Sequence, residues 1–179
     1  DSTLLTPLPI EEPQNLVRLF ATKPAAGWKT MTISAPNFRS WVDQSSTLEV
    51  AGIFGADTVN FIAGDRPERL RAIRASSEVL RVLRMHPTVG RSYDASSDQP
   101  DSPHVVLLSD SIWRKHFGAD PGVVGTTARI DDVPHEVLGV LPPEVEAAMG
   151  RFDVWTPFTY GEETEDRGYR DFDAIARLR

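Results

Sequence analysis

Apolar and polar residues in the first 85 positions follow spacings typical of strands and helices. Ser34 is suited to an N-cap, and Phe38, Trp41 and Val42 recur at i, i+3 and i+4 on one helical face. Gly55-Ala56-Asp57 separates two β-prone runs, as in a hairpin connection. The pattern predicts strands at 15–20, 48–54, 58–62 and 69–75 and helices at 35–45 and 78–85.

From about residue 88 the chain changes to shorter apolar runs and more turns. Ser109 or Asp110 is suited to cap a helix that Gly118 ends, and Asp131-Asp132 separates two strand-like runs. The pattern predicts strands at 105–108, 126–130, 136–140, 154–155 and 172–178, one helix at 109–117, and polar loops at 91–101 and 161–166. Helices and strands in this order indicate an α+β fold.

Prolines and glycines mark the segments between these elements. Residues 1–14 contain three prolines among apolar residues, which predicts an extended lead-in rather than a helix. Pro24 and Gly27 predict a loop after the first strand, and Pro142-Pro143 is expected to end the second hairpin.

Composition narrows the functions that the chain can perform. With 19 Lys+Arg against 26 Asp+Glu the 179 residues carry a formal charge of −7, which disfavours nucleic acid as a partner. The absence of cysteine excludes disulfides, thiolate metal sites and a cysteine nucleophile. No apolar run approaches the roughly 18 residues that a membrane span requires, and the chain begins at Asp1, so we expect an extramembrane piece of a longer protein.

The histidines give no pattern for catalysis or metal binding. None of His86, His104, His116 and His135 has metal-ligand spacing with another ligand, and no Gly-x-Ser-x-Gly turn surrounds Ser109. His116 is expected to pack, partly buried, on its helix, and His86 to lie in a turn. We therefore predict no catalytic, cofactor-binding or metal-binding residues and no cofactor.

The glycine-rich segment at 118–125 and two acidic pairs indicate structural roles rather than phosphate binding or catalysis. Gly118, Gly122 and Gly125 follow a helix and precede a strand, which is the reverse of a phosphate loop, and they predict a helix stop and a turn. Glu162-Glu163 and Asp131-Asp132 lie in predicted loops without aromatic neighbours and are expected to face solvent.

Seven arginines form the one local concentration of positive charge. They could meet an acidic partner or lipid headgroups. The structural alternative places them on polar faces, paired with Asp65, Glu68 and Glu78. They are Arg66, Arg69, Arg71, Arg74, Arg81, Arg84 and Arg91.

Two long motifs resemble the MacB-like periplasmic core domain of ABC transporter permeases. Val105–Gly125 has the family's strand, tryptophan helix, Phe-Gly-x-Asp-Pro turn and Val-Val-Gly, and Ile130–Pro143 has its hairpin. Shorter matches at 4–9, 15–19, 34–41, 67–71 and 153–158 extend the resemblance over nearly the whole chain. Among these permeases, the subgroup common in acidobacterial-type genomes resembles this sequence most.

The resemblance implies a domain held outside the cytoplasmic membrane between the first two transmembrane helices of a permease. It implies a porter-like α/β lobe at 1–88 and 162–179 and an inserted β-rich lobe at 89–161. Such domains relay motion from a cytoplasmic ABC ATPase to substrates or to an extracytoplasmic partner, and the permease acts as a homodimer or pseudo-dimer. A stand-alone extracellular ligand-binding module and an acid/base hydrolase remain the alternatives.

Two departures from the family pattern concern the ends of elements. Arg84 stands where the family usually has a helix-ending glycine. Residues 172–178 resemble the strand that opens the second half of the porter-like lobe, so that lobe is expected to be incomplete. We expect this strand to pair beside 15–20 or its neighbours and, without a following helix, to leave apolar sheet surface bare. Trp41, Trp113 and Trp155 are expected to be packing residues.

Overall fold

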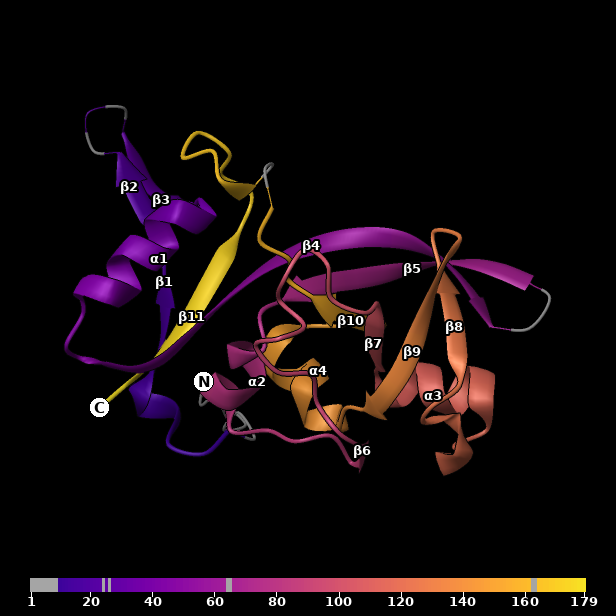
Figure 1. The fold of residues 1–179 in the computed structure, drawn as a ribbon. Helices are drawn as coiled ribbons and strands as arrows, with labels where there is room; N and C mark the ends of the chain where they lie inside the picture. The colour runs from indigo at the N-terminus through magenta and orange to yellow at the C-terminus, as the bar shows by residue number, and fades with distance from the viewer. Residues whose placement is uncertain (1–9, 24, 26, 64–65, 162–163) are drawn as a thin grey trace.

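The computed structural model describes residues 10–23, 25, 27–63, 66–161 and 164–179 (Figure 1). Its α-helices are α1 (Ala35–Gln44), α2 (Glu78–Leu83), α3 (Asp110–Phe117) and α4 (Pro143–Met149). Its strands are β1 (Leu16–Leu19), β2 (Ala21–Lys23), β3 (Trp28–Met31), β4 (Leu48–Ala63), β5 (Arg66–Ala75), β6 (Val89–Gly90), β7 (Val105–Leu108), β8 (Thr127–Ile130), β9 (Val133–Val140), β10 (Val154–Pro157) and β11 (Asp173–Leu178). The predicted α+β class is confirmed.

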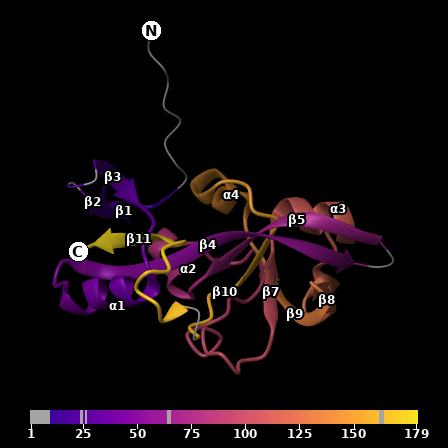
Figure 2. The same cartoon turned by 90° about the horizontal axis from the view of Figure 1, so that it is seen from above.

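Nine strands form one mixed sheet, and part of that sheet closes on itself. Its order is β1-β11-β4-β5-β10-β7-β9-β6, and β8 pairs with both β9 and β4. Strands β4, β5, β10, β7, β9 and β8 therefore make a closed circuit. Apolar side chains from these strands and from α3 fill its interior, including Phe61, Leu108, Trp113 and Val137. This small barrel is one end of the molecule, and α1 with β1 and β11 is the other (Figure 2).

At the end away from the barrel, the β1-β11-β4 part of the sheet is covered on both faces. Phe38 of α1 packs with Ile53 and Phe172 on one face. Val79 and Leu83 of α2 pack with Ile175 on the other. Among the described residues no helix is a candidate membrane span, since the longest, α1, has ten residues.

The predicted hairpin at Gly55-Ala56-Asp57 is wrong, because the two flanking runs form the single strand β4. Its partner is β5, in antiparallel register from Phe54↔Ala75 to Ala63↔Arg66. Gly55 serves close packing instead: a Cβ there would lie 3.0 Å from the Phe172 ring. Tertiary packing thus outweighs the turn propensity of this tripeptide.

Strands β2, β3 and β6 and helix α4 were not predicted. The Pro24 and Gly27 region is flanked by β2 and β3, which pair antiparallel. Pro142-Pro143 ends the β-hairpin as expected, but Pro143 also occupies the first turn of α4, where its missing N–H costs nothing.

The caps of α3 are confirmed. Ser109 is the N-cap, and its Oγ accepts a hydrogen bond from the Ile112 N–H at 3.2 Å. Gly118 ends the helix with a left-handed φ of 60°. The three tryptophans are packing residues as predicted: Trp113 and Trp155 are buried, and Trp41 is partly buried against the cluster of Phe38 and Ile53.

The C-terminal strand pairs where it was expected, but the sheet around it is not bare. β11 lies antiparallel between β1 and β4, with Leu16↔Arg177 in register. Ala174, Ile175 and Ala176 are all buried, because α1 and α2 cover opposite faces. The expectation of bare apolar surface is therefore wrong for this strand.

Candidate functional site

The guanidinium of Arg177 joins three segments that are far apart in the sequence. Arg177 is fully buried in β11. Its Nε donates a hydrogen bond to the Val82 carbonyl at 3.0 Å and its Nη1 donates to the Glu12 carbonyl at 3.2 Å. The segment that leads into β1 and the strand β11 are thereby fixed to α2 at one point. We call Glu12, Arg84 and Arg177 the strand junction.

Arg84 ends α2 at the position where the family usually has glycine. It takes a left-handed conformation with φ of 54°, and its N–H donates to the Arg81 carbonyl at 3.1 Å. A residue with a side chain in this conformation costs about 1–2 kcal/mol. Its guanidinium lies 2.7 Å from Glu12, 3.6 Å from Glu11 and 3.7 Å from Glu49, so an acidic cluster holds it over the incoming segment.

Glu68 and Glu78 form no ion pair with these arginines among the described side chains, although the structural interpretation of the arginines holds for several of them. Arg74 lies 3.7 Å from Asp57, and Arg71 stacks over the Phe152 ring. Glu68 instead pairs with Lys115 and with His116, whose Nε2 is 2.9 Å away. Glu78 accepts a hydrogen bond from Ser77, and Asp65 lies outside the described residues.

The barrel has two different ends. α3 closes one end, where Ile112 and Trp113 pack against the interior. The other end, which we call the barrel mouth, is a hollow of about 270 Å³. Its polar lining comes from all six strands of the circuit or the residues next to them: Asp57, Arg74, His104, Asp131, His135 and Thr156.

The barrel mouth brings together two histidines that are 31 positions apart. The ring centroids of His104 and His135 are 5.1 Å apart. Burial lowers the pKa of His135, the neighbouring His104 lowers it further, and the hydrogen bond to the Val133 carbonyl opposes both. The sequence contains no spacing signal for this pair, because strand pairing alone makes them neighbours.

Asp98 is a buried carboxylate that the sequence did not single out. Its Oδ2 accepts hydrogen bonds from Ser77 N–H at 3.1 Å and from Ser77 Oγ at 2.9 Å, which fastens the 91–101 loop to the start of α2. Its Oδ1 is buried and has no hydrogen-bond partner among the described residues. Burial raises the pKa of Asp98 to about 6, with a smaller contribution from Glu78 and Asp94.

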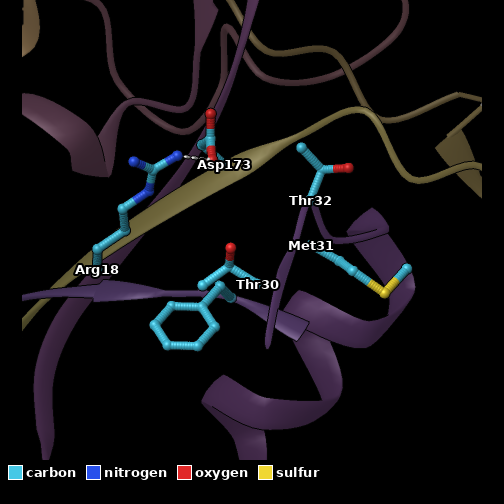
Figure 3. Close-up of a pocket in the computed structure, with 6 residues that line it drawn as sticks. Arg18, Thr30, Met31, Thr32 and Asp173 are labelled. Atoms are coloured by element: carbon cyan, nitrogen blue, oxygen red, sulfur yellow. Dashed lines mark hydrogen bonds and ion pairs between the residues drawn. The ribbon is translucent and has the colours of Figure 1, made fainter. Parts of the chain in front are cut away.

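A cavity of about 350 Å³ lies where β1, β3 and β11 meet (Figure 3). Its rim carries the Arg18 to Asp173 ion pair at 2.5 Å, and Thr30 and Thr32 contribute hydroxyl groups. Phe20 also lines it and is 47% exposed. Among the described residues of the lining, no hydrogen bond joins Asp173 to a threonine hydroxyl; Thr32 instead donates to the Arg170 carbonyl.

The remaining sequence candidates that the structure describes have the predicted structural roles. His116 packs on Phe61 at 5.9 Å between centroids, and His86 lies exposed in a loop. Asp131 and Asp132 are exposed at the β8–β9 turn, although Asp131 also accepts the Asn60 N–H. Glu162 and Glu163 lie outside the described residues.

Structural comparisons define the class of domain. The periplasmic region of MacB from Actinobacillus actinomycetemcomitans matches with a TM-score of 0.70 and 14% identity, over 94% of this chain and 78% of that one. The extracellular domain of the ABC-type transporter YknZ from Gram-positive bacteria matches with a TM-score of 0.66 and 14% identity, over 92% and 84%. The fold is therefore that of these extracytoplasmic transporter domains.

The family follows from the sequence itself. Residues 3–178 match the family model described as the MacB-like periplasmic core domain, so the chain belongs to that family. A comparison with curated proteins gave no match.

Proposed function

We propose that the chain is the extracytoplasmic domain of an ABC-type export permease and relays motion driven by a cytoplasmic ATPase. The observation that carries this proposal is the strand junction. Motion of membrane helices on either side of the domain would reach it through the segment before β1 and through β11. Because Arg177 holds both to α2, they would move as one unit and rotate the sheet rather than stretch one strand.

The relay requires two lobes that share a stiff element. We propose a porter-like lobe of residues 1–88 and 162–179 and an inserted lobe of residues 89–161. The β4–β5 ribbon is suited to connect them, because β4 pairs with β11 at one end and with β8 at the other. We further propose that the parent permease works as a homodimer or pseudo-dimer and engages an extracytoplasmic partner protein.

A catalytic role has less support. Asp98 has a raised pKa, as a general acid would, but it is 4% exposed and bonded to Ser77 rather than facing a cleft. The ligand-binding alternative would be favoured by a deep apolar pocket. The cavity at Arg18 and Asp173 is instead rimmed by an exposed ion pair.

The test uses the full permease reconstituted with its ATPase. Glu12→Gln and Arg84→Gln each remove the ion pair of the strand junction at 2.7 Å. The matched control is Arg39→Gln, which removes an ion pair of similar exposure between Arg39 and Glu165 at 2.6 Å. We expect the junction variants to retain ATP hydrolysis but to export less substrate for each ATP, whereas the control exports normally.

Equal export by the junction variants and the wild type would contradict the relay through this site. A fall in export caused equally by Arg39→Gln would show a general effect of surface charge. Melting temperatures of the isolated chains establish that the variants remain folded.

A further inference from the structure

The barrel mouth places His104 and His135 side by side on the interior face of the barrel. β7 and β9 are parallel, with Val105↔Glu136 in register, and each histidine directly precedes one of these residues. Side chains alternate along a strand, so His135 shares the face of Val137, which fills the barrel interior. The two imidazoles thus meet where the apolar filling gives way to a polar hollow.

One ring nitrogen of His135 is engaged in a hydrogen bond to the backbone. Its Nδ1 lies 2.9 Å from the Val133 carbonyl. A carbonyl only accepts, so Nδ1 carries the proton and Nε2 of the neutral ring keeps a lone pair. A histidine that donates one N–H to a backbone carbonyl and offers the other nitrogen is oriented as metal-ligating histidines are. His135 is only 9% exposed, so packing fixes its ring.

The separation of the rings fits a shared ion. A tetrahedral ion at about 2.0–2.1 Å from each nitrogen lies about 3.2 Å from each ring centroid, so the two centroids would be about 5.2 Å apart. The observed separation is 5.1 Å, with the ring planes inclined at 46°.

We propose that His104 and His135 bind one borderline transition-metal ion of the Zn²⁺, Ni²⁺ or Cu²⁺ class at the barrel mouth. No group of three or more ligating side chains was found in the described part of the chain, so water completes the coordination. Two imidazoles favour these ions over Mg²⁺ and Ca²⁺, which prefer oxygen ligands.

The charged residues around the barrel mouth are compatible with binding of a cation there. Asp57 and Asp131 line it, as does Arg74. Arg74 lies 3.7 Å from Asp57, so these two charges largely compensate each other. Asp131 remains as a negative charge, and its Oδ1 is held by the Asn60 N–H at 2.8 Å.

The test is calorimetric titration of the chain with ZnCl₂ and NiCl₂, with MgCl₂ as the comparison ion. We expect one ion per chain for Zn²⁺ and Ni²⁺ and none for Mg²⁺. His104→Ala, at an exposed position, should weaken binding at least about tenfold, because even the loss of an outer-shell partner costs 10–100-fold. His86→Ala, also exposed but in a different loop, should leave affinity unchanged.

Electron paramagnetic resonance of bound Cu²⁺ gives a second measurement and is expected to report two nitrogen ligands in the wild type and one in His104→Ala. Absence of saturable Zn²⁺ and Ni²⁺ binding would overturn the proposal, and the contact between His104 and His135 would then be one of ring packing alone. Equal affinity of His104→Ala and His86→Ala would overturn it as well. Because His104 is exposed, this variant tests the site even if His135→Ala fails to fold.

Discussion

Replacing Asp98 by Asn should change how the stability of the domain depends on pH. Asp98 is a buried residue of the 91–101 loop, and one of its carboxylate oxygens has no hydrogen-bond partner among the described residues. Burial and the charges of Glu78 and Asp94 raise its pKa from 3.8 to about 6, while two hydrogen bonds from Ser77 oppose the increase. The side-chain amide of the Asp98→Asn variant would keep an acceptor for Ser77 without a charge to bury.

The sign of the effect follows from proton linkage. The pKa of Asp98 is higher in the folded chain than in the unfolded chain, so the folded chain binds the proton more tightly. The free energy of unfolding therefore rises as the pH falls from 7 towards 4. With pKa values of about 6 and 3.8, the gain between pH 7 and pH 5 is about 1.3 kcal/mol. For a chain of this length that corresponds to about 3–5 °C in melting temperature.

Urea unfolding of the wild type and Asp98→Asn at pH 7, 6 and 5 measures this contribution. The difference between the two chains isolates Asp98 from His135, whose lowered pKa has the opposite effect on stability in acid. Asp101→Asn, an exposed carboxyl on the neighbouring turn, should retain the pH dependence of the wild type. If Asp98→Asn shows the same slope as the wild type, Asp98 does not titrate in this range and the argument from burial is refuted.

Three further outcomes test the packing and the composition of the chain. Trp113→Ala should lower the free energy of unfolding by about 3–5 kcal/mol, because the ring is 8% exposed inside the barrel; a loss below about 1 kcal/mol in urea unfolding would contradict this placement of α3. Gly52→Ala should cost about 1–3 kcal/mol, since the new Cβ would lie 2.7 Å from Val79, whereas Gly161→Ala, with nothing within 4 Å, should unfold nearly like the wild type. Chelator should leave the melting temperature nearly unchanged, because apolar side chains fill the barrel and stabilise it; a collapse that divalent metal reverses would show that folding requires metal.

Local signals determined much of the fold. The helix α3 was predictable from both ends because its caps act within a few residues: Ser109 accepts the Ile112 N–H, and Gly118 takes the left-handed conformation. Strand β7 was equally clear as a four-residue apolar run, buried at every position. The family motif at Val105–Gly125 spans these elements, so the sequence alone carries the signal of family membership.

Features made by long-range contacts were beyond local signals. The Gly55-Ala56-Asp57 turn signal was overridden because β5 pairs along the whole outer part of β4 and Phe172 packs on Gly55. Arg177 looked like an ordinary strand residue, yet it is buried, and the carbonyls of Val82 and Glu12 accept hydrogen bonds from its Nε and Nη1. The sequence by itself determined the elements whose stabilising contacts are local and the family that their order defines. Tertiary structure decided the barrel closure and both proposed sites, because strand pairing brings together residues whose separation along the chain carries no signal.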